Sequence, residues 1–126
     1  MPSTVTDRLQ GLTTSVAVKT PCIVASTTSL TLSSTQVIDG VAVSTGERVL
    51  VWRQDSSTEN GIYVVQSSAW TRALDFDGQR DVVRGTMVYV STGTFGGDRL
   101  FIVTSTGINV PGSSTISFVR TGPLST

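Results

Sequence analysis

The pattern of apolar and polar residues between positions 37 and 77 predicts a meander of short antiparallel strands. Apolar and β-branched stretches, which fit a pleated and half-buried surface, alternate with polar turns. Asp39-Gly40 and Asn60-Gly61 are the strongest turn signals, because both residue pairs tolerate the positive φ that tight hairpins require. Between these turns, residues 48–54 are apolar on both faces, which is typical of a central strand covered on both sides. We expect this meander to form the core.

Alternation within residues 48–54 predicts which side chains share a face. Val49 and Val51 point to one side of the expected strand, and Leu50 and Trp52 point to the other. Similar patterns predict further strands at 16–19, 30–32, 82–90, 100–103 and 115–120. Within 82–90, Gly85 is expected to form a bulge or bend. Strands at roughly ten-residue spacing predict an all-β fold, either a small antiparallel barrel or a sandwich.

Residues 1–20 differ from the rest of the chain and are expected to form an extended or short-helical N-terminal arm before a single β-domain at 21–126. Thr4 is a candidate cap for a short helix that ends near Gly11. About two turns of helix are not stable alone, because nucleation costs more than so short a segment returns. Either the arm is a frayed tail, or it orders against a neighbouring subunit through its apolar residues Val5, Leu9, Leu12, Val16 and Val18.

Composition limits the classes of function. The 126 residues suit one domain, and 9 basic against 9 acidic residues give no net charge. A balanced chain offers no case for binding nucleic acid or an anionic membrane, and no apolar run approaches the ~20 residues of a membrane span. No secretory signal pattern is visible, so we expect use without export by that route. Ser and Thr contribute 37 residues, which suits exposed strands and close packing between chains.

Catalytic chemistry is not expected from this set of side chains. The absence of His excludes a serine triad, a Cys–His pair and most zinc sites. The lone Cys22 cannot form an internal disulfide and is expected to be a small buried apolar residue. Glu47 and Glu59 each lie in a turn beside glycine. We therefore expect no enzyme and no cofactor.

An acidic loop contains the one candidate metal site. Asp75, Asp77 and Asp81 flank Gly78, and alternating carboxylates in such a loop can coordinate Ca²⁺. The spacing does not match the twelve-residue calcium loop of helix–loop–helix proteins. The alternative is that these aspartates form turns and pair with nearby arginines, namely Arg72, Arg80 and Arg84.

Three aromatic residues have two possible roles. Trp52, Tyr63 and Trp70 would make a sugar-binding platform if their faces were exposed together. Because Trp52 lies in a strand that is apolar on both sides and Tyr63 alternates with Val65, the alternative is that they belong to the core.

Four segments carry a resemblance to a known family. In their order and spacing, residues 38–41, 46–51, 58–65 and 69–73 resemble a module that recurs in fibre and tail-associated proteins of tailed bacteriophages. The similarity continues through 75–78, 81–83 and 85–86, so it covers about residues 18 to 120. These motifs consist of turn and core residues. The resemblance therefore implies a fold and a virion setting but no catalytic residue.

The resemblance implies a non-enzymatic structural protein of the tail or fibre apparatus. A single copy of the module favours an adaptor or attachment role. The implied partners are other virion proteins and copies of the chain itself in a symmetric homo-oligomer, assembled in the bacterial host cytoplasm into the virion. The alternatives are a head fibre or capsid decoration protein, and a carbohydrate-binding module for host surface glycans.

Overall fold

The computed structural model of the chain describes residues 17–78, 81–106 and 109–123. Within them, regular structure consists of strands and two short 3-10 turns, so the all-β prediction is confirmed. No helix in these residues has the length and hydropathy needed to cross a bilayer. The elements in chain order are β1 (Val18–Cys22), β2 (Val24–Ala25), β3 (Val37–Ile38), β4 (Val41–Ala42), β5 (Arg48–Val51), η1 (Ser57–Glu59), β6 (Gly61–Val64), β7 (Thr71–Arg72), η2 (Leu74–Phe76), β8 (Met87–Val90), β9 (Arg99–Val103) and β10 (Phe118–Pro123).

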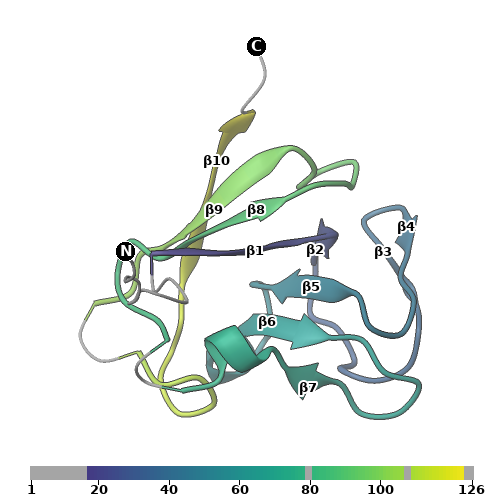
Figure 1. Cartoon of the computed structure of the whole chain (residues 1–126), viewed down its shortest axis with the longest axis horizontal. Coiled ribbons are helices and arrows are strands. Elements are labelled where there is room, and N and C mark those ends of the chain that lie inside the picture. Colours follow the sequence, from purple (N-terminus) through teal and green to yellow (C-terminus); the bar gives the residue numbers. More distant parts are fainter. Residues whose placement is uncertain (1–16, 79–80, 107–108, 124–126) are drawn as a thin grey trace, which may run out of the picture.

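Two four-stranded sheets make up the sandwich. One has the order β1-β8-β9-β10 and the other β2-β5-β6-β7, and a separate hairpin joins β3 to β4 (Figure 1). The chain passes from the first sheet to the second at Ile23, between β1 and β2. In the described part of the chain the sheets do not close into a barrel. Of the two predicted architectures, barrel or sandwich, the structure is therefore a sandwich. Two pairings, β1–β8 and β2–β5, are parallel, which the antiparallel meander did not predict.

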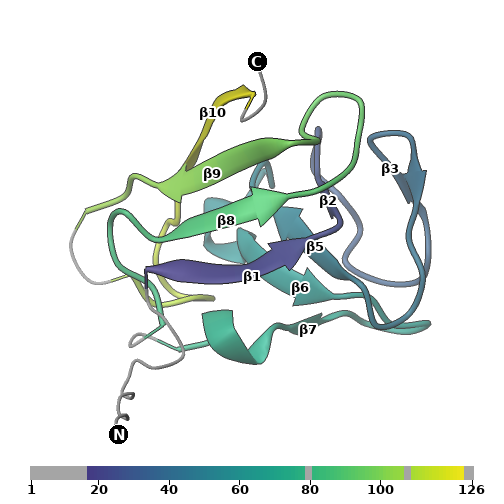
Figure 2. The ribbon, with the colours of Figure 1, turned by 45° about the horizontal axis from the view of Figure 1, so that its top comes forward.

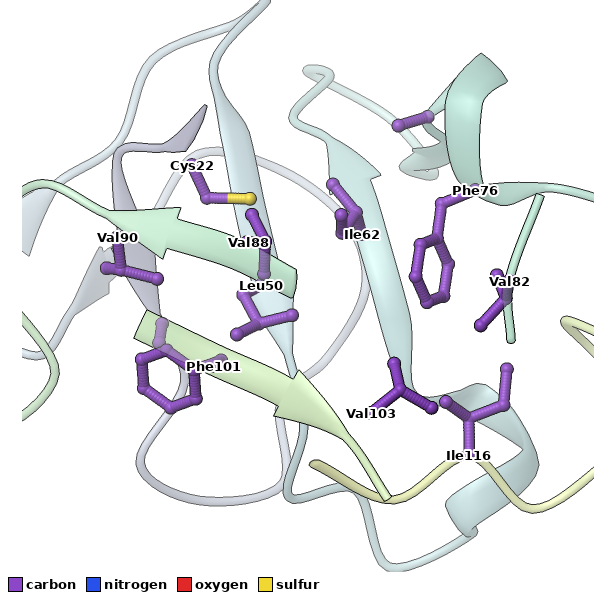
Figure 3. Packing of buried hydrophobic residues seen from close by; sticks show 12 residues of the cluster. Cys22, Leu50, Ile62, Phe76, Val82, Val88, Val90, Phe101, Val103 and Ile116 are labelled. Atoms are coloured by element: carbon purple, nitrogen blue, oxygen red, sulfur yellow. The ribbon is translucent and has the colours of Figure 1, made fainter. Parts of the chain in front are cut away.

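The main core lies between the two sheets (Figure 3). Strands of both sheets and the intervening loops contribute to it, and the largest side chains with no more than 1% exposure include Leu50, Ile62, Phe76, Phe101 and Ile116. Full burial of such a side chain contributes roughly 1.5–3 kcal/mol to folding. The core is therefore the main source of cohesion between the sheets.

A second apolar cluster covers the other face of the β2-β5-β6-β7 sheet. It contains Tyr63 and Trp70, and partly buried Leu30 and Leu32 pack against it. These leucines lie in the segment that precedes the β3–β4 hairpin, so this part of the chain covers the outer face of the sheet. The sheet is buried on both sides, as the apolar pattern of residues 48–54 predicted.

The facing of the central strand is confirmed. β5 lies between β2 and β6, with Val49 and Val51 in the outer cluster and Leu50 in the main core. Trp52, just past the end of β5, also packs against the main core. Period-two alternation places these side chains because successive residues of a strand point to opposite faces.

The Asp39-Gly40 hairpin is also confirmed. Both residues have positive φ, 49° and 82°, as a type I′ turn between β3 and β4 requires. The Asp39 carboxylate accepts hydrogen bonds from the backbone N–H groups of Phe95 and Gly96, all at 2.9 Å. Asp39 therefore forms the turn through its backbone and ties it to the β8–β9 loop through its side chain.

Three strand predictions were wrong. Residues 30–32 form no strand, because the Gln54 side chain accepts the N–H of Leu30 at 2.6 Å and donates to its carbonyl at 3.0 Å. The strand expected over 82–90 begins at Met87, since Gly85, with a φ of 98°, lies in a turn. The final strand starts at Phe118 rather than at residue 115. Just before it, Ile116 bonds through its backbone to Ser57 and Asn60.

The first strand reaches into the segment predicted to be an arm. β1 includes residues 18–20, so these belong to the first sheet, where β1 is an edge strand. Pro21 lies in β1 where the pairing with β8 is irregular, in agreement with the expected effect of a proline on an edge. Val18 is 55% exposed. The other proposed arm residues, Val5, Leu9, Leu12 and Val16, lie outside the described residues.

Candidate functional site

Asp75 in the acidic loop is engaged by an arginine that the sequence did not suggest. Its carboxylate pairs with the Arg48 guanidinium, with Nη1–Oδ1 at 3.0 Å and Nη2–Oδ2 at 3.1 Å. The expected partner Arg72 instead donates to the carbonyls of Asn60 and Thr58. Arg84 is exposed, and Arg80 lies outside the described residues. Ion pairing occurs, but its partner comes from β5.

Asp81 has a turn-forming role. Its Oδ2 accepts the backbone N–H groups of Asp77 and Gly78, each at 3.0 Å. Aspartate favours turns for this kind of local hydrogen bonding. In the described ranges, no three His, Cys, Asp or Glu side chains are grouped so as to hold a metal ion. The contacts of Asp75 and Asp81 are those that the turn and ion-pair interpretation expects.

Two buried reactive groups are side chains of β1. Cys22 is 1% exposed, and burial raises the pKa of its thiol to about 12, against the opposing effect of Arg48. Lys19 is 3% exposed, and burial lowers the pKa of its amine, although Asp75 and Asp81 act in the other direction. No ligand-sized pocket opens in the described residues. A neutral, enclosed thiol is a poor nucleophile, so Cys22 is a core residue as expected.

The three aromatic residues do not form a common platform. Tyr63 and Trp70 are 6% and 7% exposed, and their polar atoms donate to the carbonyls of Glu59 at 2.6 Å and Ser34 at 2.9 Å. Trp52 is partly buried and donates from Nε1 to Ser26 O at 2.7 Å. Their hydrogen bonds and burial are those of core aromatic residues.

A surface cluster that the sequence did not reveal lies around Phe95, in the β8–β9 loop. The guanidinium carbon of Arg120 lies 3.9 Å from the centre of the Phe95 ring, and that of Arg53 lies 5.1 Å from it. Arg53 also lies 4.5 Å from the centre of the Trp52 ring, which contacts Phe101 edge-on at 5.0 Å. We call Trp52, Arg53, Phe95 and Arg120 the arginine–aromatic cluster.

The charges of this cluster are not neutralised within the described chain. Arg53 and Arg120 both lie close to the Phe95 ring and therefore close to each other. Among the described residues, neither arginine has a carboxylate at ion-pair distance. The ring faces partly compensate two nearby cations through cation–π attraction. Arg120 Nη1 donates to Phe95 O at 2.7 Å, while Arg53 is exposed. A guanidinium that stacks on a ring retains donors at its edge, and these suit a carboxylate.

Arg120 belongs to β10, an edge strand whose outward backbone groups can be assigned. In the β9–β10 ladder, Thr104 N–H bonds to Ser117 O, and Val119 faces Ile102 in the same alternation. Hydrogen-bonded pairs alternate along an antiparallel ladder, so the backbone groups of Phe118 and Arg120 point away from β9. Figure 2 shows β10 outside β9, at the opposite edge of the sheet from β1. β10 therefore presents an open edge beside the arginine–aromatic cluster.

The other described edges are shorter or interrupted. β2 and β7 have two residues each, and β1 contains Pro21 at an irregular position. Such features block the addition of another strand. β10 is the longest edge at 6 residues, its Pro123 stands at the very end, and Val119 is 45% exposed. This edge and the arginine–aromatic cluster together form the candidate interaction surface.

Comparisons with known proteins found no matching family model, no similar curated protein and no similar solved structure. Function is therefore inferred from the geometry of the chain and from the sequence resemblance described above.

Proposed function

We propose that the protein is a non-enzymatic structural component of a tailed-bacteriophage virion, acting as an adaptor or attachment part of the tail or fibre apparatus. The observation that carries this proposal is the open edge of β10 beside the arginine–aromatic cluster. An open edge binds another polypeptide by adding a strand, with backbone hydrogen bonds for affinity and side chains for specificity. This is chemistry for assembly between proteins.

The residues of the phage-module resemblance also support a structural role. Asp39 and Gly40 form a turn that is tied to the β8–β9 loop. Asn60 accepts the Gln54 N–H at 3.0 Å and donates to Ile116 O at 3.0 Å, which links the turn before β6 to the segment before β10. These side chains hold the fold together, as the motif of a scaffold should.

Three groups that could take part in catalysis are committed to other contacts. The Cys22 thiol is buried, the Asp75 carboxylate pairs with Arg48, and Asp81 caps a turn. General acid–base or nucleophilic catalysis needs such a group within reach of a substrate. The geometry thus favours an assembly role over an enzymatic one.

The two alternative functions differ in support. A head fibre or capsid decoration protein would use the same edge, so it remains the second candidate. Carbohydrate binding has less support, because Tyr63 and Trp70 are buried and guanidinium groups lie over the rings of Trp52 and Phe95. Sugars would need those ring faces.

Labelled copies of the protein on purified virions test the proposal. Gold-tagged antibody against the full chain should mark the tail or fibres in electron micrographs. Label on the head would select the decoration alternative. Virions that contain no copy of the chain by mass spectrometry would contradict a structural role at either address.

A further inference from the structure

The strongest feature without an assigned role is the open edge of β10, beside which the guanidinium groups of Arg53 and Arg120 lie. Phe118 and Arg120 have the same facing in β10, two residues apart, with an apolar side chain first and a cation second. Phe118 stacks on Phe76 with a centroid distance of 5.9 Å, and Arg120 stacks on Phe95. A strand that adds to β10 would place an apolar residue beside Phe118 and a side chain two positions away beside Arg120. The cation there selects a carboxylate.

Self-pairing of β10 does not meet this requirement. Two copies of β10 paired around Arg120 would bring their arginines, and the adjacent Arg53 residues, to one seam. Like charges directly opposite one another destabilise a strand pair. The edge is therefore suited to an acidic strand rather than to a second β10.

The chain contains one matching segment outside its described fold. Val5, Asp7 and Leu9 alternate with polar residues, so an extended strand would place two apolar side chains around one carboxylate on the same face. Asp7 is the one acidic residue of the sequence that lies outside the described ranges. Because the apolar residues flank Asp7 on both sides, the match to Phe118 and Arg120 holds for either strand direction.

From these features we propose that residues 5–9 of one copy add as a strand to β10 of a neighbouring copy, with Asp7 bound by Arg120 and Arg53. This rests on the proposed function, in which copies of the chain join one another. The link from Leu9 to Val18 spans up to about 30 Å when extended, which is ample to cross to an adjacent subunit. The same reach allows a segment to bind β10 of its own chain, so the experiment must separate the two cases.

Charge reversal in the full-length chain tests the proposal. Asp7→Arg and Arg120→Glu should each raise the Kd of self-association at least about tenfold, measured by light scattering during gel filtration at low salt. Asp55→Arg and Arg84→Glu are matched controls, because both residues are exposed and lie outside the proposed contact. Arg53→Glu serves as a second variant should Arg120→Glu unfold, which thermal melting would reveal.

Mixing the two charge-reversal variants provides the decisive comparison. An equal mixture of the Asp7→Arg and Arg120→Glu proteins should recover association, because opposite charges then meet between the two chains. The inference is overturned if the wild-type chain stays monomeric, or if reversal variants associate like the controls. It is also overturned if the chain carrying both substitutions regains thermal stability as a monomer, since the segment would then bind its own β10. A chain that labels the virion yet fails this test would retain the proposed function and lose the inference.

Discussion

Arg48 connects three parts of the molecule through one side chain. It starts β5, its guanidinium pairs with Asp75 in η2, and its Nη2 also donates to Thr20 O in β1 at 2.9 Å. The side chains of the pair are only 19% and 15% exposed. Breaking a largely buried pair is costly, because the remaining charge keeps its desolvation penalty without its partner.

Asp75→Ala should therefore lower the free energy of unfolding by about 2–3 kcal/mol. Asp55→Ala is the control, because Asp55 is exposed and, among the described residues, only its backbone N–H is bonded, to Ser29 Oγ. Urea unfolding of both variants measures the difference. Equal, small effects would show that the Arg48–Asp75 pair adds nothing to stability.

The raised pKa of the buried Cys22 thiol predicts a specific dependence of folding stability on pH. The folded-state pKa of its thiol is raised to about 12 from 9.0, so the folded chain binds one more proton than the unfolded chain between these values. The contribution of Cys22 to stability is thus complete below pH 9 and is lost as pH rises toward 12, at up to about 1.4 kcal/mol per pH unit.

Subtracting the unfolding free energy of a Cys22→Ala variant from that of the wild type isolates this effect from the other groups that titrate at alkaline pH. The difference in unfolding free energy between wild type and variant should be constant below pH 9 and should shrink steadily above it. A difference that does not change up to pH 11 would mean that the thiol ionises in the folded protein as easily as in the unfolded chain.

Residue roles could be predicted from sequence where they are local. Burial of Cys22 followed from its apolar neighbours, and Asp81 adopted the turn role open to it. The pairing of Asp75 with Arg48 was missed, because the two residues are 27 positions apart and meet only through the fold. The cluster of Trp52, Arg53, Phe95 and Arg120 was missed for the same reason.

At the scale of elements, the β3–β4 hairpin shows how a turn also fixes a distant loop. The Asp39 carboxylate accepts two backbone N–H groups of the β8–β9 loop, from Phe95 and Gly96, while its own backbone has a φ of 49°. This contact supports Phe95, on which Arg53 and Arg120 stack. The hairpin thus holds the candidate interaction surface in place.

Asp39→Ala should destabilise the fold by about 2–3 kcal/mol, from two partly buried donors left unpaired and a left-handed conformation that alanine disfavours. Asp39→Asn should cost less, since asparagine tolerates that conformation and retains an acceptor. Thermal melting compares the two variants. Equal losses would mean that charge, rather than turn geometry or hydrogen bonding, decides the effect.

Element boundaries were predictable where turn chemistry dominates and not where side chains replace the ladder. Asp39-Gly40 stands between β3 and β4, where the sequence placed a turn. Residues 30–32 have the alternation of a strand, but the Gln54 side chain bonds the backbone of Leu30. The alternation of apolar and polar residues predicts which way side chains face. It does not show where a side chain takes the place of a backbone hydrogen-bond partner.

At the scale of the whole molecule, Trp52 joins the two sheets. It follows β5 of one sheet and contacts Phe101 in β9 of the other edge-on, at a centroid distance of 5.0 Å. It also donates to Ser26 O and lies under Arg53. The all-β class was predictable from period-two patterns and turn spacing. The strand order was not, because it depends on contacts between distant segments.

Trp52→Ala should lower the free energy of unfolding by about 3–4 kcal/mol, as expected for removal of a large packed aromatic. Trp52→Phe keeps an aromatic ring but loses the indole N–H bond and part of the packed area, so it should cost about 1–2 kcal/mol. Denaturant titration gives both values. A loss below about 1 kcal/mol for Trp52→Ala would place this ring outside the contact between the sheets.

The central claim, that the edge of β10 is the assembly surface, is tested most directly by amide exchange of three consecutive residues. In dilute full-length protein, the Val119 amide should exchange slowly because it faces β9, while those of Phe118 and Arg120 should exchange fast. In the associated protein, NMR-detected exchange should show all three protected. Association that leaves the Phe118 and Arg120 amides fast would contradict the claim.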